Sequence, residues 1–192
     1  MMLNLNRLCA GLLCLLLAGT AAIHAAEEDQ AALAGRILQA VNRPVALAHL
    51  PRSGDGRLAM GLLEGDRIRR LHGQERNYAA VQTARRRADE AGVYGRRAWF
   101  DQGSLERLWP AANSCDLVVL TDLKQSELTP VLAAEIKRVL IGWHGVAILG
   151  NAGGDGLDAG ALSSWAYTIA GQVEPFAGGG VLVKITADPL AG

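Results

Sequence analysis

The chain has 192 residues, with 19 basic and 19 acidic side chains, and half of its residues are hydrophobic. This length accommodates one ordinary domain. Arg7 is the only charged residue before Glu27, so the chain from residue 27 onward keeps 18 of the 19 basic residues against 19 acidic ones. A nearly neutral domain gives no electrostatic case for nucleic acid or for an anionic membrane as a partner.

The first 26 residues have the pattern of a secretory signal. Residues 8–22 are almost wholly apolar (LCAGLLCLLLAGTAA), Arg7 precedes them, and the small residues Ala25 and Ala26 come just before the acidic Glu27. A basic start, an apolar stretch and small residues at the cleavage point are typical of such signals. The apolar stretch is shorter than the roughly 20 residues that a membrane-spanning helix needs, so an uncleaved anchor is the weaker alternative. We therefore expect a cleaved signal over 1–26, a domain over 27–192, and a secreted or periplasmic location.

Removal of the signal also takes away Cys9 and Cys14 and leaves Cys115 as the last cysteine. A single cysteine allows no intramolecular disulfide, even in an oxidising compartment. No closely spaced pair of cysteines or histidines suggests a zinc site, so we predict no metal site.

After the signal, helical and strand patterns alternate along the chain. Apolar residues at helical spacing and short apolar runs predict, in order, a helix over 27–42, a strand over 45–49, a helix ending near 65, a strand over 68–72, a helix over 77–91, strands over 97–101 and 116–120, a helix over 129–140, a strand over 145–150, a helix over 162–170 and a strand over 181–185. This alternation predicts an α/β fold with a mostly parallel sheet and helices on both faces. In such a sheet ligands bind outside the carboxyl ends of the strands.

Three loops at those strand ends carry candidate ligand-binding residues. Ser53-Gly54-Asp55-Gly56 follows the first strand, and its glycines allow close approach of the backbone to a ligand, although a tight turn without a ligand explains them as well. Glu75 lies nineteen residues beyond Gly56, at a spacing suited to binding ribose hydroxyls; the alternative is a solvated loop glutamate. Asp101 and Gln102 follow the third strand and offer acceptors for an adenine amino group, or are simply polar loop residues.

Four segments in succession resemble the motifs of class I S-adenosylmethionine (SAM)-dependent methyltransferases. They read VALAHLPRSGDGRLA, LHGQERNYAAVQTAR, YGRRAWFDQGSLERLWPAANSCDLVVL and EIKRVLIGWHGVAILG, and together they cover roughly residues 34–151. The last two segments favour this family over an NAD-dependent oxidoreductase, which remains a distant alternative. The resemblance implies a doubly wound, Rossmann-like sheet that ends on an antiparallel hairpin over 173–185.

The same resemblance implies SAM as the cofactor and gives roles to single residues. Ser53, Gly54, Asp55 and Gly56 match the turn that holds the methionine part of SAM, Glu75 matches the ribose-binding acid, and Asp101 matches the residue near the adenine. The family has no universal catalytic side chain, because the enzyme mainly aligns the acceptor with an activated methyl group, so none is assigned.

The first turn departs from the family pattern, because Pro51-Arg52 stands where the first glycine is expected. We expect Arg52 either to pair with the carboxylate of the cofactor or to be solvated. Trp109, in the connection after the third strand, is a candidate for lining a ligand cleft.

The AGVYGR segment and the glycine-rich approach to VLVKI are similar to exported methyltransferase-like segments at the N-terminus of proteins with quinoprotein-type (PQQ-like) propeller repeats. This similarity implies a possible propeller-type partner domain or protein. Two functions therefore remain open: an exported methyltransferase acting on a small molecule or an envelope component, and a catalytically inactive binding or accessory domain.

Overall fold

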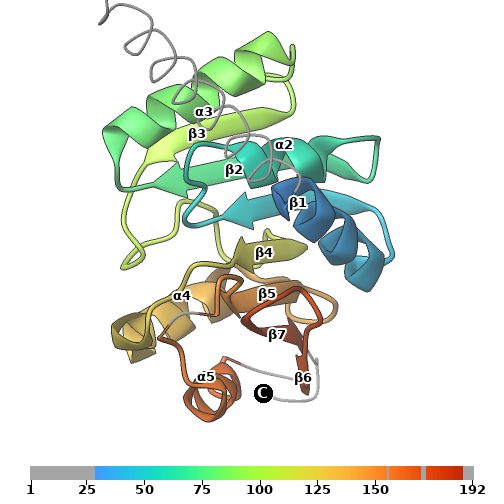
Figure 1. Ribbon diagram of the computed structural model, residues 1–192. Coiled ribbons are helices and arrows are strands. Elements are labelled where there is room, and N and C mark those ends of the chain that lie inside the picture. Colours follow the sequence, from blue (N-terminus) through green and yellow to red (C-terminus); the bar gives the residue numbers. More distant parts are fainter. Residues whose placement is uncertain (1–28, 155, 170–171, 188–192) are drawn as a thin grey trace, which may run out of the picture.

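The structure, a computed structural model, describes residues 29–154, 156–169 and 172–187 (Figure 1). The predicted signal over 1–26 lies outside the described residues. The helices are the N-terminal one, described over 29–41, α2 (Arg57–Leu63), α3 (Tyr78–Glu90), the 3-10 helix η1 (Gln125–Glu127), α4 (Pro130–Val139) and α5 (Ala159–Ala166). The strands are β1 (Val45–Leu50), β2 (Ile68–Glu75), β3 (Ala98–Gln102), β4 (Leu117–Leu120), β5 (Val146–Asn151), β6 (Gln172–Pro175) and β7 (Val181–Thr186).

The seven strands form one sheet in the order β3-β2-β1-β4-β5-β7-β6. Neighbouring strands from β3 to β5 are parallel, whereas β7 is antiparallel to both β5 and β6. The strand order reverses between β1 and β4, which pair through Ala48 with Leu117 and His49 with Val118. These observations confirm the predicted doubly wound α/β sheet and its closing antiparallel hairpin.

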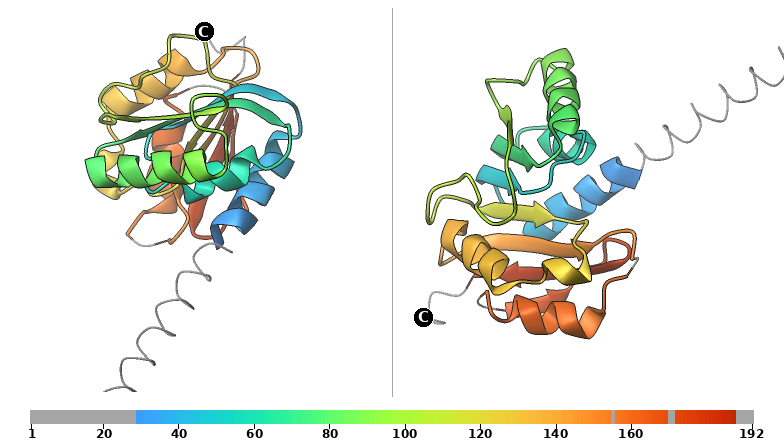
Figure 2. Two further views of the ribbon diagram at one scale, coloured as in Figure 1. Left: turned by 90° about the horizontal axis from the view of Figure 1, so that it is seen from above. Right: turned by 90° about the vertical axis from the view of Figure 1, so that its left-hand side faces the viewer.

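Helices cover both faces of the sheet (Figure 2). Each face has its own apolar core. The N-terminal helix, α2 and α3 bury Ile37, Leu62 and Val81 against one face. On the other face, α4 and α5 bury Ile136 and Leu162. Burial of this apolar surface on both sides explains the continuous apolar runs of β4 and β5.

Side chains at the helix starts fix where the helices begin. Asn77 accepts hydrogen bonds from the backbone of Ala79 and Ala80 at the start of α3, and Thr129 caps α4 ahead of Pro130. Asp158 accepts from the backbone N–H of Ala161, so α5 begins three residues earlier than its apolar pattern predicts.

β2 is longer than its apolar residues indicate. The predicted strand ends at His72, but pairing with β3 continues through Gly73, Gln74 and Glu75. Among the described residues no helix is both long and apolar enough to cross a membrane.

Candidate cofactor cleft at the carboxyl ends of the strands

The turn after β1 contains the first group of predicted site residues. The backbone N–H of Ser53 donates to the carbonyl of Gln74 (3.0 Å), which ties the turn to β2. Gly54 and Gly56 have φ angles of 54° and 86°, a left-handed conformation that favours glycine. A Cβ on Gly54 would meet open space, whereas a Cβ on Gly56 would lie 2.9 Å from the Cβ of Ala84 in α3. Gly54 therefore leaves the backbone open to a ligand, and Gly56 permits close packing of the turn on α3.

Glu75 is brought directly to this turn. It is the last residue of β2, and its side chain is largely buried. One carboxylate oxygen accepts the backbone N–H of Gly54 (3.2 Å), and the other accepts the N–H of Asn77 (2.9 Å). Each carboxylate oxygen has a further lone pair, so the group can still accept hydrogen bonds from hydroxyls.

The other two predicted acids have protein partners of their own. Asp55 contacts the guanidinium groups of Arg57 (3.3 Å) and Arg87 (3.4 Å), so it links the turn to α2 and α3. Asp101 contacts His72 Nε2 and Arg85 Nη2, both at 3.0 Å. The structure thus brings Ser53, Gly54 and Glu75 together but directs Asp55 and Asp101 toward arginines.

The third strand ends one residue later than predicted. Asp101, the last residue of the predicted strand, and Gln102, which was expected to follow it, both belong to β3, and Asp101 pairs in register with Gln74 of β2. The loop begins at Gly103, so Ser104 and Leu105 are the residues that line the cavity beside this strand end. Sequence reasoning missed them, although their place directly after a paired strand was the signal that could have found them.

Arg52 crosses the cleft and separates two cavities. One, of about 250 Å³, is also lined by Arg76, Ser104 and Glu127. The other, of about 400 Å³, lies by the first turn and is lined by Ser53 and Gly54. The Arg52 side chain lines both, so it stands at the boundary between them.

The partners that hold Arg52 follow β4. Its Nη1 lies 3.1 Å from Glu127 Oε2 and donates to the carbonyl of Asp122 (3.0 Å), and its Nη2 donates to Glu127 Oε1. Burial acts to raise the pKa of Glu127, but the hydrogen bonds from Arg52 and from the Lys124 backbone outweigh it, so this pKa lies below its ordinary value. Arg52 is thus ion-paired with Glu127 and 22% exposed, rather than the solvated loop arginine that was one of the two expectations.

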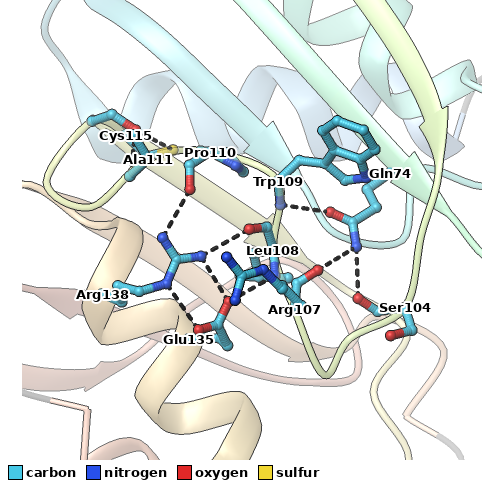
Figure 3. Close-up of polar contacts among 11 residues, drawn as sticks. Gln74, Ser104, Arg107, Leu108, Trp109, Pro110, Ala111, Cys115, Glu135 and Arg138 are labelled. Carbon is cyan, nitrogen blue, oxygen red and sulfur yellow. Dashed lines mark hydrogen bonds and ion pairs between the residues drawn. The ribbon is translucent and has the colours of Figure 1, made fainter.

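The connection between β3 and β4 has no helix and is held by side chains instead (Figure 3). Gln74, fully buried, donates through Nε2 to the carbonyls of Ser104 (2.6 Å) and Arg107 (3.0 Å) and accepts the N–H of Trp109 (3.0 Å). Arg138 of α4 donates to the carbonyls of Leu108 and Pro110. This network fixes the loop that bears Ser104.

Trp109 lines a further cavity of about 540 Å³ together with Arg107 and Arg138, and Gly103 and Ser104 line both this cavity and the one beside Arg76 and Glu127. Its indole is 61% exposed, and the ring lies 6.1 Å from that of His72. Trp109 thus lies beside a cavity, but one that does not include Arg52 or the first turn.

Two stacked histidines lie on the sheet below this connection and were not singled out from the sequence. The rings of His49 in β1 and His72 in β2 are 5.2 Å apart, and His49 Nδ1 lies 3.0 Å from the carbonyl of His72. Complete burial, with the neighbouring His72, lowers the pKa of His49 to about 3, so this imidazole is neutral at pH 7. In the described part of the chain no cluster of three or more His, Cys, Asp or Glu residues could hold a metal ion.

Comparison with known proteins gives structural relatives only: the sequence matches no protein-family model and no curated protein. A putative SAM-dependent methyltransferase from Methanococcus maripaludis is similar, with a TM-score of 0.69 at 13% identity over 84% of this chain and 86% of that one. A TehB-like SAM-dependent methyltransferase from Corynebacterium glutamicum gives a TM-score of 0.60 at 18% identity, over 82% and 87% of the two chains.

A third similar structure, YcgJ from Bacillus subtilis, gives a TM-score of 0.53 at 19% identity over 63% of this chain, which spans only 50% of that chain. Together with the strand order, these likenesses show that the chain has a class I methyltransferase-like fold.

Proposed function

We propose that the chain is a SAM-dependent methyltransferase that binds its cofactor at the carboxyl ends of β1 and β2. The observation that carries this proposal is the contact between Glu75 and the backbone of Gly54, in the turn that follows β1, one of the two strands between which the strand order reverses. Ligands of doubly wound sheets bind at that point. The names of the similar solved proteins agree with this choice of cofactor.

The residues present suit such a cofactor. The Ser53 hydroxyl is buried and has no hydrogen-bond partner in the described part of the chain, although a buried polar group normally has one. Ser53 and Gly54 line the cavity of about 400 Å³, where no Cβ stands over Gly54. Ser53 thus places a hydroxyl that is unpaired among the described residues, and Gly54 an uncovered backbone, beside this cavity.

The chain's own residues would act by binding and orientation. When bound, SAM supplies a methyl group that its sulfonium already activates. Glu75, held in place by Gly54 and Asn77, would accept the ribose hydroxyls through its remaining lone pairs. Ser104 and Leu105 would border the adenine, because they line the cavity on the β3 side of Arg52. Such a site accelerates transfer by alignment of the two reactants, without a dedicated catalytic base.

The proposal includes export, on the basis of the apolar stretch over 8–22 and the small residues that follow it. The methyl acceptor would then be a small molecule or an envelope component outside the cytoplasm. N-terminal sequencing of the protein from a bacterial periplasmic fraction tests this. A mature start at Glu27 supports export, and an intact N-terminus in the cytoplasmic fraction contradicts it.

One observation favours a second function, a binding or accessory domain without methyl transfer, such as the propeller-associated domains that the sequence resembles. Arg52 is ion-paired with Glu127 between the two cavities, so a ligand that occupies both cavities must displace it. If that displacement does not occur, the cleft accepts only a ligand confined to one cavity.

Calorimetric titration of the full chain with SAM tests the first proposal. We expect saturable binding, weakened about tenfold or more in Glu75→Gln, because a hydrogen bond to a charged group contributes about 1.5–3 kcal/mol. Glu90→Gln is the matched control, since Glu90 is an exposed glutamate at the end of α3. Absence of heat at millimolar SAM, with both proteins folded by circular dichroism, would contradict the proposal and leave the accessory domain.

A further inference from the structure

A second depression lies at the opposite edge of the sheet from the cofactor cleft. It has a volume of about 660 Å³ and is bordered by Val45 and Ile68, the first residues of β1 and β2. Arg97, which directly precedes β3, and Asp116, which directly precedes β4, also line it. The depression is therefore formed by the amino-terminal ends of four neighbouring strands.

Five arginines line this depression against two aspartates. They are Arg67, Arg69, Arg70, Arg96 and Arg97. With Asp66 and Asp116 as the acidic residues, the lining carries three positive charges in excess. The chain as a whole has equal numbers of acidic and basic residues, so this concentration is local. Clustered charge in a concave surface raises the local concentration of counter-ions.

The negative charge of Asp116 is already satisfied within the fold. Its Oδ2 accepts the backbone N–H groups of Ala46 (2.8 Å) and Leu47 (3.1 Å), and its Oδ1 lies 3.4 Å from Arg43 and 3.1 Å from His144. These bonds hold the pKa of Asp116 below its ordinary value, against the opposing effect of burial. Asp116 therefore does little to neutralise the five arginines.

Among the described residues, no acidic partner neutralises the five arginines. Arg67 donates to the carbonyl of Leu38, and Arg97 donates to the carbonyls of Gly65 and Ile68, which are uncharged partners. Arg69, Arg70 and Arg96 are exposed and make no ion pair within the described residues. Their guanidinium groups offer planar, paired N–H donors, which match phosphate oxygens in geometry and charge.

We propose that this depression binds a soluble small molecule bearing a di- or triphosphate group. Five arginines that line one depression favour a multivalent oxyanion over a single carboxylate. The volume exceeds that of a lone phosphate and accommodates the rest of a nucleotide-sized molecule. The site lies at the opposite ends of the strands from Glu75 and Arg52. Its occupancy can therefore be tested independently of methyl transfer.

The experiment is a calorimetric titration of the full chain with pyrophosphate, repeated on Arg70→Gln and Arg96→Gln. We expect one saturable site and about tenfold weaker binding in each variant, because each removes a charge-assisted hydrogen bond. Arg86→Gln is the control, since Arg86 is exposed on α3 outside the depression and removes the same charge. Its affinity for pyrophosphate should change less than twofold, as expected for a distant screened charge.

Three outcomes would overturn the proposal. The first is the absence of saturable heat at millimolar pyrophosphate, and the second is equal weakening by Arg86→Gln and Arg70→Gln, which would indicate a general charge effect. The third is binding to phosphatidylglycerol vesicles, lost in Arg70→Gln, without any binding of pyrophosphate. All three variants alter exposed side chains, and unchanged thermal unfolding midpoints would show that each remains folded.

Discussion

Gly56 offers the sharpest test of the packing at the first turn. Substitution by alanine would place a Cβ 2.9 Å from the Cβ of Ala84, and ordinary contacts between such atoms begin at 3.4 Å. Overpacking of this kind costs about 1–3 kcal/mol. The φ angle of 86° adds the penalty of a left-handed conformation, about 1–2 kcal/mol. We therefore expect Gly56→Ala to lower the free energy of unfolding by about 2–5 kcal/mol, a large part of the total for one domain.

The matched control is Gly65→Ala, which has a φ of 72° and open space around the added Cβ. It should lose only the backbone part, about 1–2 kcal/mol. Urea unfolding followed by circular dichroism measures both variants. If Gly56→Ala is too unstable to purify, the double variant with Ala84→Gly should recover only part of the steric loss, since it removes the opposing Cβ but leaves the Cα of residue 84 at 3.0 Å. Equal losses in Gly56→Ala and Gly65→Ala would refute the packing argument.

Three further predictions concern side chains far apart in the sequence. Arg52→Ala should bind SAM about three- to tenfold more tightly than the native chain, because the ligand no longer has to break the Arg52–Glu127 ion pair and Glu127 then faces the cationic ligand. Weaker binding of this variant in calorimetry would instead make Arg52 a partner of the ligand. The pKa of His49 is about 3 in the folded chain and 6.5 in the unfolded chain. Protonation of His49 therefore leaves the free energy of unfolding unchanged above pH 6.5 and lowers it by about 1.4 kcal/mol per pH unit between pH 6.5 and about 3. His49→Gln should remove this part of the pH dependence in urea unfolding, and an identical slope in both proteins would contradict the burial argument. Arg138→Met should destabilise the chain by about 1–3 kcal/mol and speed proteolysis within 103–113, because two loop carbonyls lose their hydrogen-bond donor. The control is Lys137→Met, on the exposed side of α4, which should have neither effect.

The sequence predicted the order of the elements because apolar spacing reports which faces are buried. It also placed Gly54 and Glu75 at the carboxyl ends of two parallel strands, and the structure brings them into contact there. Nothing in the apolar pattern marks the last residues of β2, where Gly73 and Gln74 are buried by contacts with β3 and with the loop after it. Strand ends of this kind depend on partners elsewhere in the chain.

The errors at the site have the same origin. The segment around Asp101 and Gln102 gave no sign of how far the pairing with β2 continues, or of the contact between Asp101 and Arg85 on α3. Arg52 is not solvated because it pairs with Glu127, which follows β4 in a segment that no local pattern relates to the first turn. Sequence reasoning thus pointed to the strand ends where the structure has cavities, and could not identify Arg52 as the side chain that lines two of them.

The position of β1 in the sheet has a consequence for folding kinetics. β1, β2 and β3 are connected through α2 and α3, so this half of the sheet can form from contacts between successive segments. The pairing of Ala48 with Leu117 joins β1 to β4 across a much longer stretch of chain, and closure of long loops costs more entropy. We expect this junction to form last and to open first. A ligand bound where the two halves meet would then slow unfolding more than it speeds folding.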